Sequence, residues 1–317
     1  MKPYSFPIAQ ELELVRTYLE NYIGQERGML RDVLSKISLE GKMLRPALLL
    51  LAAKLGHEYD KDRLCRLGAL LELVHIASLI HDDIVDDSPL RRGKTTVQHG
   101  FGKDIAVYTG DFILARIVYH LLSEGLNDSG VILARAVEDM CRGEIEQYKF
   151  RHDPNTPIDS YINNIRDKTA SMFVAAFEIA ALESGCSPSL SDKLRLIGLH
   201  MGLAFQLRDD ILDFGQQSEG KLTHRDFRDG IFTLPVLHAL RTEATSAPLR
   251  NLILSNQSYS DGDISKMHAL VHESGGITFA RTHIQEHTTA IHQILNSLDD
   301  NPYKSTLTDV TSWLAHA

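Results

Sequence analysis

The sequence predicts an all-α fold in a single domain, and three observations support this prediction. Apolar residues recur three and four positions apart along nearly the whole chain, as they do in amphipathic or buried helices. Runs of alternating Val, Ile and Thr bounded by turn pairs, which would indicate strands, are missing. Finally, no Pro-, Gly- or Ser-rich linker divides the 317 residues. We therefore expect one domain over residues 1–317.

The apolar period and the turn residues set the expected helices in chain order. Gly41 precedes one helix, Ser88-Pro89 ends the next, and Thr233-Leu234-Pro235 opens a later one. The segments 61–81 and 169–182 carry apolar or small residues on most faces, so both are expected to be buried. The expected helices are 9–35, 43–56, 61–87, 104–125, 128–150, 158–184, 190–217, 231–242, 261–273, 275–297 and 302–315.

Composition and charge exclude several classes of protein. The formal net charge of −9 argues against nucleic acid as a partner, since such proteins carry a basic footprint. Cys65, Cys141 and Cys186 lie far apart and form no CxxC pair, which is typical of reduced cysteines. The first seven residues show no signal-type apolar run, and no stretch approaches eighteen uncharged apolar residues. We therefore expect a cytoplasmic protein without stable membrane insertion.

Two aspartate clusters share one spacing, Asp-Asp-x-x-Asp, inside apolar helical runs. Residues i, i+1 and i+4 fall on one side of a helix, so each cluster directs its carboxylates one way. Carboxylates at the end of the apolar run 70–80 also oppose the helix dipole, which favours a bound cation over an ordinary acidic helix end. Two such clusters facing each other across a cavity would hold Mg²⁺ and a phosphorylated ligand. The clusters are Asp82, Asp83 and Asp86, and Asp209, Asp210 and Asp213.

Basic residues accompany the clusters in positions suited to phosphate oxygens. Arg91 and Arg92 follow the first cluster, and arginine binds phosphate bidentately. A helix start that carries two cations on one face is an anion site, and an ammonium on an apolar helix is costly unless it is paired. The further basic candidates are Lys42, Arg45, Lys168 and Lys221. A diphosphate ester bound through several Mg²⁺ ions and a second diphosphate bound by Lys42 and Arg45 would use all these charges. Since the surrounding helices are apolar, the ester is expected to be an isoprenoid.

These residues resemble the trans-isoprenyl diphosphate synthase (polyprenyl synthetase) family, whose motifs occur here in order between about 41 and 235. The resemblance implies an antiparallel helical bundle around a deep central cavity, of the isoprenoid synthase type, and a homodimer. The matching pieces are Gly41-Lys42-x-x-Arg45-Pro46, His75, Asp82-Asp83-x-x-Asp86, Arg91-Arg92-Gly93-Lys94, Gly110-Asp111, Lys168-Thr169, Phe205-Gln206-x-x-Asp209-Asp210-x-x-Asp213 and Gly220-Lys221.

The resemblance also implies a role for each matching residue. The aspartates are expected to hold three Mg²⁺ ions against the allylic diphosphate, with Asp210 and Asp213 in support. Thr169 and Gln206 are expected to face the carbocation, although Gln206 alone also fits an ordinary polar core residue. The expected ligands of the allylic diphosphate are Arg91, Lys168 and Lys221, and those of isopentenyl diphosphate are Lys42, Arg45, His75 and Arg92. The family often has a lysine where this chain has Ile231, which leaves one contact in question.

The implied reaction condenses isopentenyl diphosphate with an allylic diphosphate and releases diphosphate. Ser78 lies one helical turn before Asp82, Ala77 lies beside it, and Val74 lies two turns before. Short-chain members of the family carry bulky aromatic residues at the positions of Ala77 and Ser78. Small residues leave the cavity open, so we expect a medium or long product of about six to eight isoprene units, with residues near Leu114 or Val118 as an alternative floor.

Four other functions fit parts of the sequence. A farnesyl or geranylgeranyl diphosphate synthase would need a floor deeper in the cavity. A catalytic subunit that requires a small partner chain would carry the same motifs. A terpene cyclase is disfavoured because it usually replaces the second aspartate cluster. A non-catalytic subunit is disfavoured because both clusters are intact.

Overall fold

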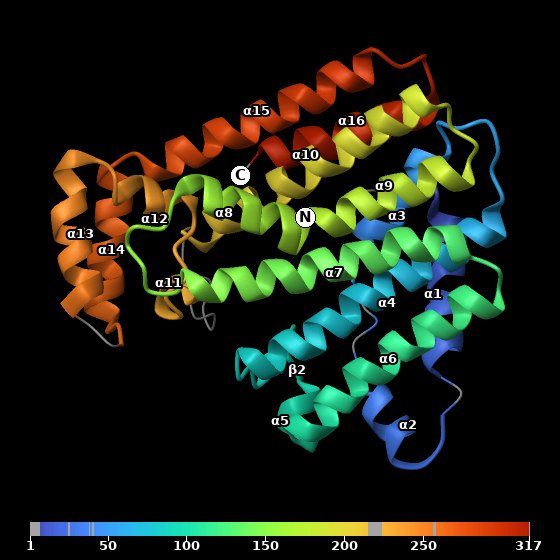
Figure 1. The fold of residues 1–317 in the computed structure, drawn as a ribbon, viewed down its shortest axis with the longest axis horizontal. Helices are drawn as coiled ribbons and strands as arrows, with labels where there is room; N and C mark the ends of the chain where they lie inside the picture. Colours follow the sequence, from blue (N-terminus) through green and yellow to red (C-terminus); the bar gives the residue numbers. More distant parts are fainter. Residues whose placement is uncertain are drawn as a thin grey trace. The chain divides into compact units, whose positions relative to one another are not determined.

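The fold is all-α, as the sequence predicts. The computed structural model describes residues 7–24, 26–37, 39, 41–214, 224–255 and 258–316. Among these residues, the only strands are the two-residue strands β1 (Leu90–Arg91) and β2 (Lys94–Thr95), which pair antiparallel with Arg91 opposite Lys94 (Figure 1). Every other regular element is a helix.

The helices follow one another with short connections, and Figure 1 labels most of them. The first part of the chain forms α1 (Ala9–Ile23), α2 (Gly28–Leu34), α3 (Leu44–Ala53), α4 (Lys61–Val85), α5 (Val97–Phe101), α6 (Lys103–Ser123) and α7 (Asn127–Lys149). Then come α8 (Ile158–Ile165), the π-helical turn η1 (Arg166–Ala170), α9 (Ser171–Glu183) and α10 (Pro188–Asp213). The last helices are α11 (Arg225–Arg228), α12 (Leu234–Ala239), α13 (Glu243–Ser255), α14 (Asp261–Glu273), α15 (Gly276–Asn296) and α16 (Pro302–Ala315).

The chain forms two compact units. The first comprises residues 1–137, 175–195 and 301–307, and the second comprises residues 138–174, 196–300 and 308–317. The boundaries between the units fall within or next to helices rather than in a linker. The expectation of one domain over residues 1–317 stays a prediction.

Helix α4 forms the core of the first unit, where α1, α3 and α6 pack against it (Figure 1). Apolar residues on most of its faces are buried, as expected for the segment 61–81. The helix begins with Asp60, whose side chain accepts a hydrogen bond from the Arg63 backbone N–H at 3.1 Å, a regular N-cap. By length and composition alone, α4 and α6 could each cross a membrane, but 72% of the apolar window of α4 is buried inside the protein.

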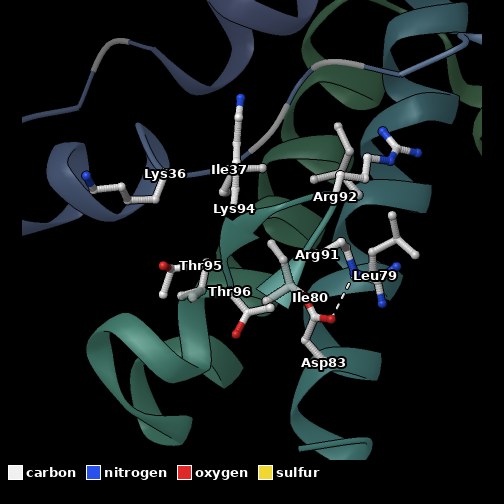
Figure 2. A pocket seen from close by; sticks show the side chains of 12 residues that line it. Lys36, Ile37, Leu79, Ile80, Asp83, Arg91, Arg92, Lys94, Thr95 and Thr96 are labelled. Atoms are coloured by element: carbon white, nitrogen blue, oxygen red, sulfur yellow. Dashed lines mark hydrogen bonds and ion pairs between the residues drawn. The ribbon is translucent and has the colours of Figure 1, made fainter. Parts of the chain in front are cut away.

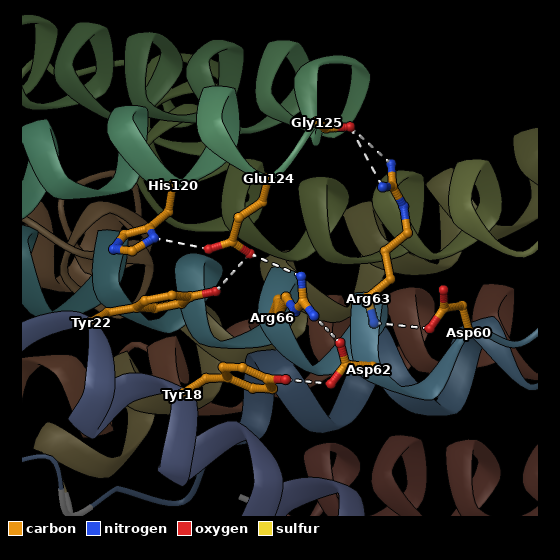
Figure 3. Close-up of polar contacts among 9 residues, drawn as sticks. All are labelled: Tyr18, Tyr22, Asp60, Asp62, Arg63, Arg66, His120, Glu124 and Gly125. Atoms are coloured by element: carbon orange, nitrogen blue, oxygen red, sulfur yellow. Dashed lines mark hydrogen bonds and ion pairs between the residues drawn. The ribbon is translucent and has the colours of Figure 1, made fainter.

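A polar network joins α1, α4 and α6 at the N-terminal end of α4, far along this helix from the aspartates (Figure 3). His120 and Tyr22 both contact the Glu124 carboxylate, at 2.9 and 3.2 Å. Arg66 lies 3.5 Å from the same carboxylate and also pairs with Asp62. The network therefore ties these three helices together through one shared carboxylate, that of Glu124.

In the second unit, α12 packs against α13, α14 and α15. Helix α14 starts with a capping box, in which Ser260 accepts from the Asp263 backbone N–H and Asp263 accepts from the Ser260 backbone N–H. Gly276, at the start of α15, lies so close to the Pro235 carbonyl that a side chain would collide with it. This close approach joins α15 to α12.

Several predicted helices differ from the observed ones because local breaks were not recognised. The segment 9–35 is two helices, α1 and α2, since Gly24 caps the end of α1 and Gly28 has a positive φ of 60°. Gly102 separates α5 from α6 with a φ of 97°. The prediction missed α5 and also α13, which contains Pro248, as well as α11 and the hairpin β1–β2. The predicted end of 190–217 lies outside the described residues.

Candidate functional site

The first aspartate cluster lies at the C-terminal end of α4, and its three carboxylates differ in exposure. Asp82 is partly exposed and Asp86 is exposed, whereas Asp83 is only 5% exposed. An oxygen of Asp83 accepts a hydrogen bond from Arg91 Nε at 2.8 Å, which Figure 2 shows as a dashed line. The middle carboxylate is therefore anchored, while the outer two reach the surface on one side of the helix.

The hairpin β1–β2 presents the two arginines that follow this cluster. Its two-residue turn is Arg92-Gly93, with positive φ values of 51° and 77°, as a type I′ turn requires. A positive φ is unfavourable for arginine, and such strain is common at functional sites. Arg91, Arg92 and Asp83 line a small cavity of about 60 Å³ together with Lys94 (Figure 2). The cavity therefore combines basic side chains with aliphatic ones, among them Ile76 and Ile80.

Lys42 and Arg45 lie at the start of α3, as predicted. Met43, between them, is buried and has a positive φ of 49°, so the chain bends there before the helix begins. Lys42 is exposed and Arg45 is half-buried. Backbone N–H groups at the start of a helix lack intrahelical acceptors, so this helix end and its two cations suit an anion.

His75 lies on α4, where the charges of Arg45, Arg92 and Arg91 act on it. Burial, and after it the nearby guanidinium groups with Arg45 first, together lower the pKa of His75 to about 2. The imidazole is therefore neutral in the protein without ligand. It is a hydrogen-bonding group in a cationic environment, which fits the predicted role at a diphosphate.

The Gly110-Asp111 pair, quoted for the resemblance, meets His81 of α4 in the first unit. The His81 ring lies so close to Gly110 that any side chain there would overlap it. Nε2 of His81 is 3.5 Å from the Asp111 carboxylate. The glycine is thus needed for the close approach of α6 to the end of α4.

The second aspartate cluster ends α10 and repeats the exposure pattern of the first. Asp209 is exposed, Asp213 is partly exposed, and Asp210 is only 2% exposed. Asp210 accepts hydrogen bonds from the Tyr161 hydroxyl and, at 2.9 Å, from Gln206 Nε2. Burial raises the pKa of Asp210 to about 7, against the effect of these hydrogen bonds. Both oxygens of this carboxylate are engaged by neutral groups.

Lys168 and Thr169 lie in the π-helical turn η1, a kind of insertion that is frequent at functional sites. Lys168 Nζ is 2.7 Å from the Glu144 carboxylate and donates to the Gln147 side-chain oxygen at 3.0 Å, so its charge is paired. A Cβ on Gly143 would lie 2.7 Å from the Lys168 backbone nitrogen. Only glycine permits this approach of α7 to the turn.

A chain of hydrogen bonds links this turn to the second cluster. Thr169 Oγ1 donates to Gln206 Oε1 at 2.8 Å, and Gln206 in turn donates to Asp210. The structure thus brings together Thr169 and Gln206, which the sequence predicts to act together. The amide carbonyl of Gln206 accepts the threonine hydroxyl in the absence of ligand.

The segment after the second cluster is described only in part. Lys221, a predicted diphosphate ligand, lies outside the described residues. His224 is buried, has a positive φ of 59°, and donates its backbone N–H to Asp213 at 2.9 Å. Ile231, which stands where the family often has lysine, is half-buried, and its backbone N–H donates to the Asp226 carbonyl at 2.7 Å.

The predicted chain-length residues lie on α4 inside the first unit. Val74 and Ala77 are 2% and 1% exposed, and Ser78 is half-buried. The Ser78 hydroxyl donates to the His75 carbonyl at 2.8 Å, so its hydrogen bond is made within the helix. Of the two alternative floor residues, Val118 is 55% exposed and therefore points away from the interior of this unit.

The carboxylates suit a hard divalent cation that also binds a ligand. Within the described ranges, no three His, Cys, Asp or Glu side chains form a complete metal site by themselves. Asp82 and Asp86, like Asp209 and Asp213, are four residues apart and reach the surface. Mg²⁺ usually takes one or two carboxylates and completes its shell with water and substrate phosphates. The donor set therefore fits Mg²⁺ bound together with a diphosphate.

Sequence reasoning missed several residues that position the candidate ones. Tyr161 anchors Asp210, and Glu144 and Gln147 hold Lys168. Their partners are distant in the chain, so no local pattern indicates them. Glu72, by contrast, could have been noticed in the sequence, because it is a charged residue within an otherwise apolar stretch of helix.

Comparison with known proteins agrees with this geometry. The sequence model of the polyprenyl synthetase family matches residues 27–271. The chain is 38% identical over 249 residues to heptaprenyl diphosphate synthase component 2 of Geobacillus stearothermophilus, covering 78% of this chain and 77% of that one. It is 33% identical over 315 residues to the all-trans-nonaprenyl-diphosphate synthase of Rhodobacter capsulatus, covering 96% and 94%.

Solved structures show the same fold. The polyprenyl synthase of Caulobacter crescentus, complexed with calcium and isoprenyl diphosphate, superposes with a TM-score of 0.90 at 30% identity, covering 98% of this chain and 95% of that one. The geranylgeranyl pyrophosphate synthase of Lactobacillus brevis gives 0.87 at 28% identity, covering 98% of both. The chain therefore belongs to the polyprenyl synthetase family and is a trans-isoprenyl diphosphate synthase.

Proposed function

We propose that this enzyme elongates an allylic diphosphate with isopentenyl diphosphate to an all-trans polyprenyl diphosphate of about six to eight isoprene units, releasing diphosphate. The observation that carries the proposal is the repeated design of the aspartate clusters. In each cluster, the outer carboxylates reach the surface and the middle one is buried and anchored.

The basic residues divide between the two substrates. Arg91, Lys168 and Lys221 bind the allylic diphosphate, and cations near it stabilise the charge that develops as the C–O bond breaks. Arg92 and the residues Lys42, Arg45 and His75 bind isopentenyl diphosphate. Holding both substrates lowers the barrier by proximity. Thr169 and Gln206 then turn their oxygens toward the allylic cation, and apolar walls exclude water from it.

The aspartates hold the metal in this proposal. Three Mg²⁺ ions are expected, bound by Asp82, Asp83, Asp86 and Asp209 with Asp210 and Asp213 in support. When bound, Mg²⁺ neutralises the leaving diphosphate and so assists its departure. The calcium ion and isoprenyl diphosphate in the Caulobacter crescentus protein support a divalent cation and a prenyl diphosphate as ligands here. We also propose that both units work as one domain, since the family match at 27–271 includes parts of each.

The product length rests on Val74, Ala77 and Ser78. Small side chains at 77 and 78 leave room for a growing prenyl chain, and the relatives that make heptaprenyl and nonaprenyl diphosphate favour a medium or long product. A short product is the second candidate, because a geranylgeranyl pyrophosphate synthase has a similar fold. The fold alone therefore does not distinguish the two.

Product analysis tests both candidates. The purified protein is incubated with Mg²⁺, radiolabelled isopentenyl diphosphate and farnesyl diphosphate, and the products are separated by chain length. We expect about six to eight units for the wild type and a shorter product for Ser78→Tyr and Ala77→Tyr. Leu254→Tyr, at an exposed position of α13, is the control and should keep the parent length. If Leu114→Tyr shortens the product and the α4 variants do not, the floor lies on α6.

We propose a homodimer that covers one face of α6. Large apolar side chains along this helix are exposed, and only 33% of its apolar window is buried within the chain. Leaving such a stripe in water is unusual for a monomer. The exposed residues are Val107, Tyr108, Val118, Tyr119 and Leu122. Light scattering should give twice the 35.5 kDa of the chain, and Tyr108→Glu should shift the protein toward the monomer.

A small partner subunit and the location of the enzyme are further points to test. The similarity to a component 2 protein raises the possibility of a partner chain, and activity of the purified protein alone decides whether one is required. A cytoplasmic location is our proposal, and cell fractionation with antibody detection tests it. Product in the absence of any second chain would make the partner unnecessary.

A further inference from the structure

Glu72 is a buried carboxylate to which the proposed mechanism gives no role. It lies on α4, one turn before His75, and is 8% exposed. Taking a carboxylate out of water costs roughly several kcal/mol unless charged partners compensate this penalty. The groups around Glu72 must therefore explain why a charge is kept at this place in an apolar helix.

Two arginines of the candidate isopentenyl diphosphate site compensate this charge. Burial raises the pKa of Glu72, whereas the guanidinium groups of Arg45 and Arg92 act in the opposite direction. A Cβ built on Gly41 would lie 3.3 Å from Arg92 Nη1 and 3.5 Å from Glu72 Oε1. The two charged groups thus flank the same point of the backbone, immediately before Lys42.

The two arginines and Glu72 come from three different elements. Arg45 lies in the first turn of α3, and Arg92 lies in the turn of the hairpin, where its φ of 51° is unfavourable. Glu72 lies on a third element, the helix α4. Within the described part of the chain, Glu72 Oε2 has no hydrogen-bond partner, so the carboxylate retains acceptor capacity at this site.

We propose that Glu72 is a positioning residue, whose carboxylate orients the guanidinium groups of Arg45 and Arg92 so that both bind the diphosphate of isopentenyl diphosphate. This inference rests on the proposed function and deepens it. Arginine presents several N–H donors in a rigid plane, so a carboxylate on one edge leaves the other donors directed at a phosphate. Glu72 acts through the arginines and does not touch the substrate.

The substitution Glu72→Gln separates orientation from charge because the two effects have opposite signs. Glutamine keeps the size of the side chain and removes one negative charge. If charge alone mattered, a more cationic site would bind a diphosphate more tightly. If the carboxylate orients the arginines, its loss weakens binding despite the added positive charge. The direction of the change therefore decides the question.

Isothermal titration calorimetry of metal-free protein with isopentenyl diphosphate gives the direct readout. We expect Glu72→Gln to raise the dissociation constant about tenfold, as loss of a buried charge partner commonly does. The KM for isopentenyl diphosphate should rise by a similar factor, while kcat and the KM for the allylic substrate stay within about twofold. Glu183→Gln is the matched control, since Glu183 is also buried and pairs with an arginine, Arg63, and its binding constant should not change.

Circular dichroism and thermal unfolding establish that each variant is folded. Should Glu72→Gln fail to fold, Glu72→Asp keeps the charge and withdraws the carboxylate by one methylene, and we expect about threefold weaker binding. Unchanged or tighter binding by a folded variant overturns the inference, as does an equal rise in the allylic KM. Failure of the proposed function itself would be seen separately, as no consumption of isopentenyl diphosphate by the wild type.

Discussion

The two aspartate clusters have the same spacing, yet their middle carboxylates are held by different chemistry. In the first cluster, Asp83 pairs with the cationic Arg91 at 2.8 Å. In the second, Asp210 receives hydrogen bonds from the neutral groups of Tyr161 and Gln206, and burial raises its pKa to about 7. One middle acid thus pairs with a cation, whereas the side chains that hydrogen-bond the other, within the described residues, are neutral.

This difference shows that an identical motif does not set identical electrostatics. A carboxylate beside a guanidinium keeps its negative charge at neutral pH. A buried carboxylate with only neutral donors is partly protonated near pH 7, so it gains its full charge only where a cation is nearby. The second cluster therefore depends more on bound metal for its charge than the first.

The largest effects are expected from the outer acids, where the two clusters should behave alike. Asp82→Asn and Asp209→Asn should each lower kcat by about 1000-fold, because each removes a proposed ligand of the metal that assists the leaving diphosphate. Incorporation of radiolabelled isopentenyl diphosphate measures this loss. Asp87→Asn is the control: Asp87 lies at the same helix end but forms an exposed ion pair with Lys103, so its activity should be near that of the wild type. If Asp209→Asn kept more than a tenth of the wild-type activity, the outer acids of the two clusters would not be equally important.

Substitution of the buried middle aspartate should lower kcat by different factors in the two clusters. Asp83→Asn removes the partner of Arg91 and should lower kcat about 100-fold. Asp210→Asn should lower it only about tenfold, because the groups that hold this position, Tyr161 and Gln206, are neutral and can also hydrogen-bond an amide. The measurement is steady-state kinetics of both variants at saturating Mg²⁺. Equal losses in the two variants would contradict the proposed difference in charge.

The anchor of the second cluster should have a smaller effect. Tyr161→Phe removes the hydroxyl that donates to Asp210, and we expect about a fivefold loss of kcat with a higher requirement for Mg²⁺. Tyr18→Phe is a matched control, since Tyr18 donates to Asp62 in the network at the other end of α4 (Figure 3) and should not change the kinetics. A Mg²⁺ requirement unchanged in Tyr161→Phe would show that Tyr161 is not an anchor.

The smallest effect concerns the stability of the unit that carries the second cluster. His287 contacts His200 at 3.0 Å, and burial lowers its pKa to about 4, from an unfolded value of about 6.5. Since the unfolded chain binds the proton more readily, this pair favours folding above pH 6.5, and its contribution is lost as the pH falls toward 4. His287→Gln should flatten the pH dependence of the unfolding free energy by about 1 kcal/mol. Urea unfolding at pH 7 and pH 5 measures the difference, and parallel curves for the two proteins would refute it.

The helices and the chemical class of the site could be predicted because their signals are local. Helix α16 agrees closely with its predicted range, 302–315, and Thr169 lies within hydrogen-bond distance of Gln206, whereas the roles predicted for these residues stay predictions. The break between α1 and α2, and the hairpin that presents Arg92, could not be predicted from periodicity. They depend on single backbone angles, which the apolar pattern does not encode.

The sequence by itself determined the fold class and the reaction, because residue types at helical spacing place six carboxylates and their cations in a few motifs. Only the tertiary structure decided which carboxylate of each cluster is buried and what holds it. Asp83 takes its partner eight residues away, whereas Asp210 takes Tyr161 from 49 residues away. Such contacts arise from packing between distant helices, and packing also decides how strongly a buried charge is compensated.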